Sequence, residues 1–288
     1  MNETDWQNII QQEKEGRLPY APEGTADSNP KQWGLGGAPT VQPLADLEQA
    51  WYWPDQHGHY VEPKLWQASL NAIREHQPHR LILGGDWLDL HPISRWNAAQ
   101  RKRMQWYEVS RECEGERDFG RRMLDELRNV YSGPIDWTGG NHDLDRLEDW
   151  LPEGEIYDWL GFTQAGVTCH NRSGFYLRPG HLMMHGNFAS KTATKAHWEH
   201  FGGSGYHAHC HRYQVHSVAY PGGRVEEWVG SPTMCRLDID YLPGKSGLAK
   251  WHQGWLAGTL DRTRCLSTDV ARWDASMERL VLRGEVYR

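Results

Sequence analysis

The fold is decided by the stretch Leu81-Ile82-Leu83-Gly84-Gly85-Asp86-Trp87-Leu88-Asp89. Its three consecutive apolar residues predict a short buried strand, and the two glycines allow the backbone to turn closely after it. Asp86 follows directly. A carboxylate in such a place is costly to bury unless a cation pairs with it. The stretch therefore predicts a central strand with a charged site at its end.

Four further polar segments occur along the chain, and most of them also follow a short apolar run. They are Asp55-Gln56-His57, Gly140-Asn141-His142-Asp143, His185-Gly186 and His209-Cys210-His211. Carboxylate, amide and imidazole ligands without thiolate suit divalent cations such as Mn²⁺, Fe²⁺ or Zn²⁺. Two such ions about 3.5–4 Å apart form a hydrolytic site for phosphate esters. The segments together predict a two-metal site.

Strands and helices alternate between these segments. We expect a helix from Pro63, a long helix over roughly 97–130, and strands at 134–138 and 182–184. This alternation indicates an α/β protein, in which ligands gather beyond the carboxyl ends of the strands. After residue 213 the strand-like segments are 225–229, 255–260 and 279–286, which suggest a second or mixed sheet.

The first 45 residues differ in texture from the rest of the chain. They contain five prolines and a Gly-Leu-Gly-Gly run, which predict a short helix followed by an irregular arm. We therefore expect an N-terminal extension at 1–45 and a catalytic domain at 46–288. The chain holds 16 Trp and only 5 Phe, and we expect Trp to take the place of Phe in the core.

Composition limits the class of protein. The 288 residues carry a net charge of −7, and no apolar run approaches the roughly 20 residues that span a bilayer. The N-terminus is polar and acidic, unlike a secretory signal. Five scattered cysteines without a CxxC pair are compatible with a reducing cytoplasm. We expect a cytoplasmic protein without a membrane partner or a broad DNA-binding surface.

Each segment has a plainer alternative. Asp55 and His57 would point the same way from an extended strand end, but they also suit a solvated turn. A Gly-Asn turn would explain Asn141, though not the neighbouring His142. His185 taken alone would more often be structural. Cys210 among imidazoles suggests a structural zinc site, although no second cysteine lies near it in sequence.

The order and spelling of the five segments resemble the calcineurin-like metallophosphoesterase superfamily, whose pattern is DxH, GDxxD, GNH(D/E), H and GHxH. The match spans roughly residues 50–212, and the overall texture is similar to phage and bacterial members. The resemblance implies an α/β four-layer sandwich, with two mixed β-sheets flanked by helices.

The resemblance also implies roles for individual residues. It places one metal on Asp55, His57, Asp86 and His211, and the other on Asp86, Asn141, His185 and His209. Asp86 would bridge the two ions. His142 would donate a proton to the leaving oxygen and Asp89 would orient it. The expected cofactors are two divalent ions, Mn²⁺ first, with Fe, Zn or Ni as alternatives.

The last motif has two possible registers, since His207, His209 and His211 are spaced two apart. The family has Gly before the first His of this motif. Ala208 departs from Gly less than Tyr206 does, so we assign the metals to His209 and His211 and leave His207 out.

The implied reaction is hydrolysis of a phosphate ester by in-line attack of a metal-bridging hydroxide. Leu90-His91 stands where protein phosphatases have Arg-Gly, which argues against a phosphoprotein substrate. We expect a phosphodiester, either a nucleotide or nucleic acid. The alternatives are a phosphomonoesterase, a dinucleoside-polyphosphate hydrolase, and a non-catalytic metal-stabilised binding module. No protein partner is implied. Lys191, Lys195, Arg212 and, with less support, the basic run 101–103 are candidate phosphate contacts.

Overall fold

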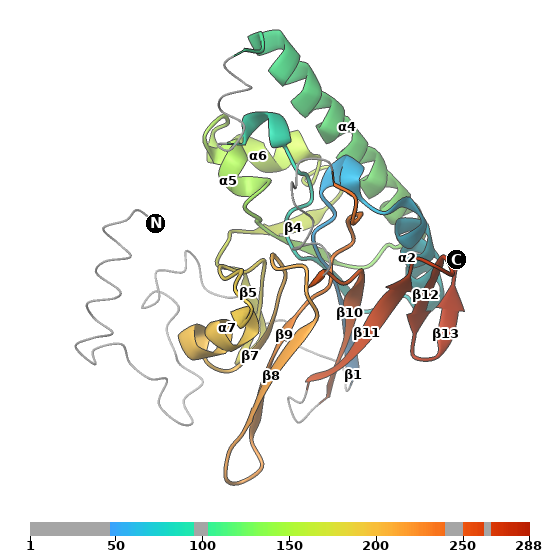
Figure 1. Cartoon of the computed structure of the whole chain (residues 1–288), viewed down its shortest axis with the longest axis vertical. Helices are drawn as coiled ribbons and strands as arrows, with labels where there is room; N and C mark the ends of the chain where they lie inside the picture. Colours follow the sequence, from blue (N-terminus) through green and yellow to red (C-terminus); the bar gives the residue numbers. More distant parts are fainter. Residues whose placement is uncertain (1–46, 95–102, 240–249, 262–265) are drawn as a thin grey trace, which may run out of the picture. The chain divides into compact units, whose positions relative to one another are not determined.

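The computed structural model describes residues 47–94, 103–239, 250–261 and 266–288 (Figure 1). The extension predicted at 1–45 lies outside these residues, so the division of the chain stays a prediction. None of the described helices has the length and apolar composition that crossing a bilayer requires.

Within the described residues, the first sheet has eight strands in the order β13-β12-β11-β10-β1-β2-β3-β4. Their bounds are β1 Leu47–Trp53, β2 Arg80–Leu83, β3 Ile135–Thr138, β4 Val167–His170, β10 Gly254–Asp261, β11 Leu266–Asp274, β12 Arg279–Leu282 and β13 Glu285–Tyr287. Strands β1 to β4 run parallel, whereas β10 pairs antiparallel with β1 and the later strands continue antiparallel. The sheet is therefore mixed.

The second sheet has five strands in the order β5-β6-β7-β9-β8. Their bounds are β5 Phe175–Arg178, β6 His181–Met184, β7 Ser204–His207, β8 Gln214–Ala219 and β9 Val225–Gly230. Strands β6, β7 and β9 run parallel, while β5 and β8 are antiparallel to their neighbours at the two edges. This sheet is mixed as well.

The helices lie on the outer faces of the two sheets (Figure 1). They are α2 Pro63–His76, α4 Trp106–Val130, α5 Leu144–Glu148, α6 Glu153–Leu160 and α7 Ala193–Phe201, with short 3-10 turns η2 Gly58–Tyr60 and η3 His91–Ile93. Helices α2 and α4 pack on the side of the first sheet, and α7 packs on β8 and β9 of the second.

Three separate hydrophobic cores lie between these layers. Trp51 and Trp53 of β1 face the core under α2 and α4, whereas the alternate residues Ala50 and Tyr52 face the second sheet. A third, smaller core packs Trp228 of β9 against α7. Helices, sheet, sheet and helix make four layers, so the predicted sandwich of two mixed sheets is confirmed.

Several predicted elements are confirmed, including the helix that begins at Pro63 and the strand at Leu81–Leu83. The start of the long helix was wrong, because α4 begins at Trp106, after a turn over the described residues 103–105. The C-terminal strands do not form a sheet of their own, since β10 to β13 extend the first sheet and β8 and β9 complete the second.

The prediction that Trp fills the core is confirmed for seven of these residues, each exposed by 5% or less. They are Trp51, Trp53, Trp66, Trp87, Trp137, Trp228 and Trp255.

Candidate metal centre

The candidate ligands lie in the loops that follow five strands. Asp55 follows β1, Asp86 follows β2 and Asn141 follows β3, all parallel strands of the first sheet. His185 follows β6 and His209 follows β7, which are parallel in the second sheet. The carboxyl ends of both sets of strands supply one site, as expected for an α/β fold.

The loop backbones are strained at the candidate ligands. Asp55, His57, Asp86, His209 and His211 have φ values of 46°, 54°, 50°, 67° and 55°. Residues other than glycine seldom adopt this left-handed conformation, and such strain concentrates at functional sites. The expectation that Asp55 and His57 share an extended strand end was wrong, because β1 ends at Trp53 and a tight loop positions both side chains.

Asp86 lies at the centre of the site. Its Oδ2 is 3.2 Å from Nε2 of His185 and 3.8 Å from Nε2 of His57. Its Oδ1 accepts a hydrogen bond from the backbone N–H of His142 at 2.8 Å. Burial would raise the pKa of Asp86, but the imidazoles of His185 and His142 hold it well below its usual value. The carboxylate of Asp86 therefore lies between histidines on both sides of the site.

Asp55, His57 and His211 form one side of the site. Nε2 of His57 is 3.2 Å from Nε2 of His211, which is 3.4 Å from Oδ1 of Asp55. All three side chains are buried, and among the described residues Oδ2 of Asp55 has no hydrogen-bond partner. A buried carboxylate oxygen without a partner, beside two facing imidazole nitrogens, suits a divalent cation.

Asn141, His185 and His209 form the other side, again with Asp86. Nε2 of His185 is 3.1 Å from Oδ1 of Asn141. One ligand atom each from Asp86, His185 and His209 lies within 4.8 Å of the others. Asn141 and His209 are only partly buried, unlike His185. Solvent therefore reaches the site from the side of Asn141 and His209.

Two of the histidines are oriented by acceptors on Nδ1. Nδ1 of His185 lies 2.8 Å from the carbonyl oxygen of Gly84, and Nδ1 of His57 lies 3.0 Å from Oδ1 of Asp89. A proton on Nδ1 leaves the lone pair on Nε2, the atom that faces the site in both residues. Gly85 makes this approach possible, since a Cβ there would lie 2.6 Å from the His185 ring.

Asp89 also contacts the proposed acid. Its Oδ1 lies 2.7 Å from Nδ1 of His142, and the carboxylate is buried whereas His142 is partly exposed. Burial opposes ionisation, yet hydrogen bonds from His142 and His57 lower the pKa of Asp89 well below its usual value. The arrangement that the sequence predicted for His142 and Asp89 is present, with His57 as an additional partner.

Sequence reasoning missed Glu116 of α4. Its buried carboxylate accepts hydrogen bonds from the backbone N–H groups of Asp89 and Leu90. Burial and the charge of Asp89 raise the pKa of Glu116 to about 8. The carboxylate also packs against Gly58, where a Cβ would lie 2.7 Å from Oε1 of Glu116. Nothing in the sequence pairs Gly58 with a helix so far along the chain.

Asp143, quoted only as the end of its motif, holds two loops together. Its carboxylate accepts hydrogen bonds from the backbone N–H of Trp87 at 2.7 Å and of Gly140 at 2.8 Å. Burial, with the charge of Asp86 nearby, raises the pKa of Asp143 to about 6. The side chain fixes the loops that carry Asp86 and Asn141 against each other.

The sequence left two alternatives open: His207 as a metal ligand and Cys210 as part of a structural zinc site. Both side chains have contacts outside the groups of close ligand atoms. Nε2 of His207 lies 2.9 Å from Oγ1 of Thr194, and its ring stacks on that of His197 at 4.0 Å. The thiol of Cys210 lies 3.9 Å from the carbonyl oxygen of Arg212. Among the described residues, the grouped ligand atoms include the thiol of Cys235 and not that of Cys210.

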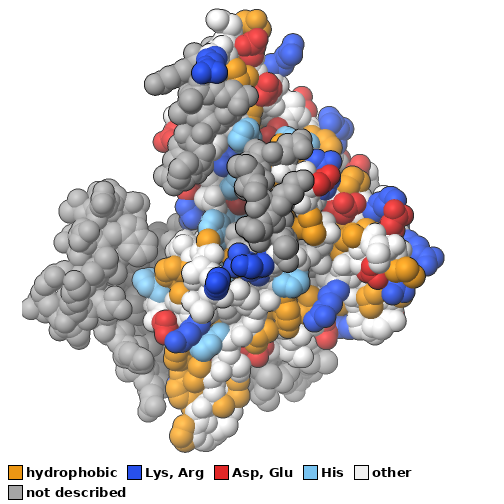
Figure 2. Space-filling model, viewed as in Figure 1, with side chains coloured by type: hydrophobic (Ala, Val, Ile, Leu, Met, Phe, Trp, Pro, Cys, Tyr) orange, Lys and Arg blue, Asp and Glu red, His pale blue; other side chains and the backbone are white. Residues whose placement is uncertain are grey.

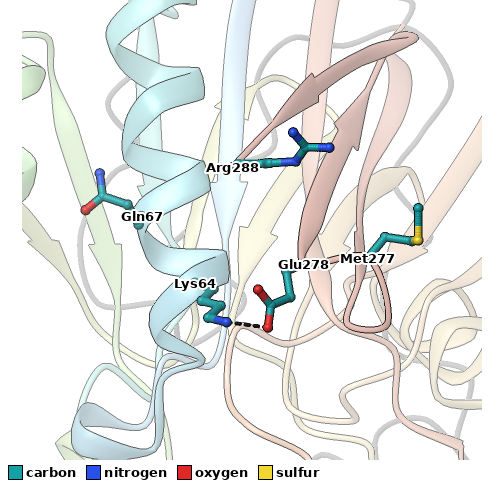
Figure 3. A pocket seen from close by; sticks show the side chains of 5 residues that line it. All are labelled: Lys64, Gln67, Met277, Glu278 and Arg288. Carbon is teal, nitrogen blue, oxygen red and sulfur yellow. Dashed lines mark ion pairs between the residues drawn. The ribbon is translucent and has the colours of Figure 1, made fainter.

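A shallow surface pocket lies elsewhere, between α2 and the C-terminal strands (Figure 3). Lys64, Gln67, Met277, Glu278 and Arg288 line it, and Lys64 pairs with Glu278. None of the candidate ligands lines this pocket, so it is separate from the metal centre.

No protein-family model matches the chain. Two proteins described as gene 54 proteins, from Mycobacterium phages L5 and D29, are each 28% identical to it. Each match covers 70% of this chain and 85% of the phage protein. The chain is thus similar to phage proteins over most of their length.

Solved structures with similar architecture include Vps29 from Cryptosporidium parvum (TM-score 0.44, 10% identity, 84% of this chain and 99% of that one). A predicted phosphoesterase from Streptococcus pneumoniae gives a TM-score of 0.37 at 10% identity, covering 80% of this chain and 91% of that one. The two mixed sheets and the site beyond their strands agree with the fold that the five sequence motifs imply.

Proposed function

We propose that the protein is a dinuclear-metal phosphoesterase that hydrolyses a phosphodiester, either a nucleotide or nucleic acid. The observation that carries the proposal is the position of Asp86. Its Oδ2 lies 3.2 Å from Nε2 of His185 and 3.8 Å from Nε2 of His57, which are proposed ligands of different ions. A single carboxylate between two sets of imidazoles suits a bridge between two cations.

We propose the ligand assignment that the motifs imply, and the distances given above support it. Asp55, His57, Asp86 and His211 would hold one ion, and Asp86, Asn141, His185 and His209 the other. Two bound divalent ions, Mn²⁺ first, would supply an activated water and neutralise charge on the phosphate. The buried Oδ2 of Asp55, which has no hydrogen-bond partner among the described residues, supports the fit of a cation there.

His142 would act on the leaving group. The carboxylate of Asp89 would accept a hydrogen bond from Nδ1–H of His142. Nε2 of His142 is then the atom available to hold a proton for the departing oxygen. The partial exposure of His142 keeps this atom accessible from the side where solvent reaches the site. A protein that only binds metal needs neither His142 nor its pairing with Asp89, and this favours an enzyme over a binding module.

The surroundings favour a phosphate ester as substrate. Arg212 directly follows His211 in the chain and is half-buried, and we propose it as a contact for the phosphate. Lys195 is a weaker candidate because it pairs with Glu199 on α7 at 3.1 Å. Figure 2 shows Lys and Arg side chains near histidines on the drawn face. The four described cysteines are free thiols, consistent with the proposed cytoplasmic location.

The diester preference can be tested with two nitrophenyl substrates in the presence of Mn²⁺. We expect kcat/KM for bis(p-nitrophenyl) phosphate to exceed that for p-nitrophenyl phosphate by about tenfold or more. A preference for the monoester would favour a phosphomonoesterase instead. Faster hydrolysis of a dinucleoside polyphosphate to nucleotides than of either nitrophenyl substrate would favour a dinucleoside-polyphosphate hydrolase.

A further inference from the structure

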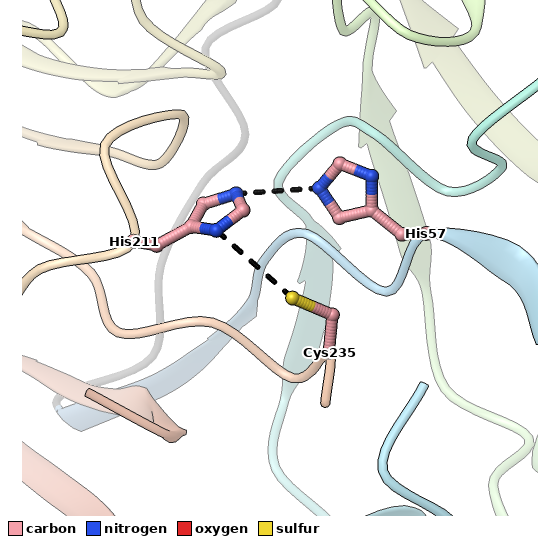
Figure 4. Close-up of side chains that lie close together, drawn as sticks. All are labelled: His57, His211 and Cys235. Atoms are coloured by element: carbon pink, nitrogen blue, oxygen red, sulfur yellow. Dashed lines mark hydrogen bonds between the residues drawn. The ribbon is translucent and has the colours of Figure 1, made fainter. Parts of the chain in front are cut away.

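Cys235 lies beside the metal centre, although it belongs to none of the sequence motifs. It follows β9 in a loop and its side chain is fully buried. Its sulfur, together with one nitrogen each of His57 and His211, forms a group of atoms within 4.8 Å of one another (Figure 4). The sulfur is a free thiol.

The two nitrogens of His211 face different partners. Nε2 points to His57, 3.2 Å away, and to Oδ1 of Asp55, 3.4 Å away. Nδ1 points in the other direction, to the sulfur of Cys235 at 4.0 Å (Figure 4). An imidazole that binds a metal through Nε2 carries its proton on Nδ1 and needs an acceptor there.

Two other candidate ligand histidines have an oxygen atom as the acceptor at Nδ1. His57 uses the carboxylate of Asp89 and His185 uses the carbonyl of Gly84. The geometry points to Cys235 as the positioning residue of His211, with its sulfur accepting the Nδ1–H so that Nε2 is presented to the ion. This inference rests on the proposed metal assignment, and it is independent of which ester the protein hydrolyses.

The sulfur is held in place by Thr233, which also contacts the loop of Asp55. Oγ1 of Thr233 lies 3.0 Å from the sulfur and 3.0 Å from the carbonyl oxygen of Asp55, and it accepts the backbone N–H of Cys235 at 3.1 Å. Nε2 of Gln253 donates to the carbonyl of Cys235 at 2.9 Å. Thr233 therefore couples Cys235 to the loop that carries Asp55, so His211 and Asp55, which would hold the same ion, share a support.

A direct bond from the sulfur to the ion fits this geometry less well. The sulfur faces Nδ1 of His211, whereas Asp55 and His57 face Nε2, on the other edge of the ring. Cobalt spectroscopy distinguishes the two roles, because a thiolate bound to Co²⁺ gives a charge-transfer band in the near ultraviolet. We expect the Co²⁺-loaded wild type to lack this band. Its presence would overturn the positioning role.

Metal affinity tests the role independently of turnover. In titrations with Mn²⁺, Cys235→Ala should weaken one of two sites by about 10–100-fold and leave the other unchanged. Cys235→Ser keeps an acceptor and should lose less. Cys113→Ala is the matched control: it also removes a buried thiol, but one on α4 that is in none of the groups of close ligand atoms, and it should bind Mn²⁺ as the wild type does.

A double-mutant cycle with His211 separates positioning from a general structural effect. His211→Ala should weaken the same site, and adding Cys235→Ala to it should cause no further loss of affinity. Additive losses, or an affinity of Cys235→Ala equal to that of the wild type, would overturn the inference. If the variants bind Mn²⁺ as predicted but the wild type hydrolyses no ester, the positioning role of Cys235 stands and only the proposed activity is refuted. A wild type that binds no Mn²⁺ would refute both.

Discussion

Nδ1 of His142 lies 2.7 Å from Oδ1 of Asp89, and the carboxylate is buried while the imidazole is partly exposed. His142→Ala should therefore keep both metals and lose rate, because the imidazole contacts the carboxylate rather than supplying a proposed ligand atom. We expect a loss of about 10²–10⁴-fold, largest for esters with poor leaving groups. Equal losses on nitrophenyl and alkyl esters would argue against leaving-group protonation.

Asp89→Asn should behave differently from His142→Ala. The same oxygen of Asp89 lies 3.0 Å from Nδ1 of His57, a proposed ligand. An amide in place of the carboxylate weakens the orientation of both imidazoles, so metal affinity and rate should fall together. Mn²⁺ titration and steady-state rates measured on the same preparation check this, and a variant with unchanged metal affinity would separate Asp89 from the ligand His57.

Asp86 should matter to both ions. Its Oδ2 lies close to His185 on one side and His57 on the other, so Asp86→Asn should lower the affinity for two ions. His57→Ala should lower the affinity for one. Metal analysis after dialysis against a fixed low Mn²⁺ concentration measures the difference. Two tightly bound ions in Asp86→Asn would show that the carboxylate does not bridge.

The register of the last motif predicts a contrast between His211 and His207. His211→Ala should lose one metal and most activity. His207 contacts Thr194 and stacks on His197, so His207→Ala should lower stability by about 2 kcal/mol or more through its cavity and keep its metals per folded molecule. Metal content and urea unfolding measured on both variants decide it. The reverse pattern would move the motif two residues upstream.

Glu116 gives the stability a defined dependence on pH. Burial and Asp89 raise its pKa from 4.5 to about 8 in the folded protein, so the folded state retains a proton that the unfolded state releases. Its contribution is complete below about pH 4.5 and is lost as the pH rises to about 8. With chelator present, the free energy of unfolding of Glu116→Gln should fall less than that of the wild type between these values. Parallel pH profiles would contradict the shift.

Local patterns in the sequence predicted the strands well where a strand and the loop with a candidate ligand are contiguous. The run before Asp86 gives both the strand and the ligand after it, and the same holds for Asn141 and His185. The exception was the backbone at Asp55 and His57. Asp and His adopt the left-handed conformation more often than most residues do, but only in a small fraction of cases, so their identity alone did not predict it.

Contacts between distant segments were beyond such patterns. Glu116 reaches Asp89 from a helix, and Cys235 reaches His211 through a loop, so only the folded chain brings each pair together. Strand β11 was missed because Leu266–Asp274 is largely polar and only partly buried, with a single fully buried residue, Ala271. Its pairing with β10, more than its own hydrophobic pattern, defines it.

The central claim is that Asp86 joins two metal sites that hydrolyse a phosphodiester. The most direct measurement is metal content per chain together with hydrolysis of bis(p-nitrophenyl) phosphate, for the wild type and Asp86→Asn prepared side by side with Mn²⁺. We expect two ions and turnover in the wild type, and fewer ions with turnover lowered by about 10²-fold or more in the variant. A wild type that binds two ions without turnover, or a variant as active as the wild type, would contradict the claim.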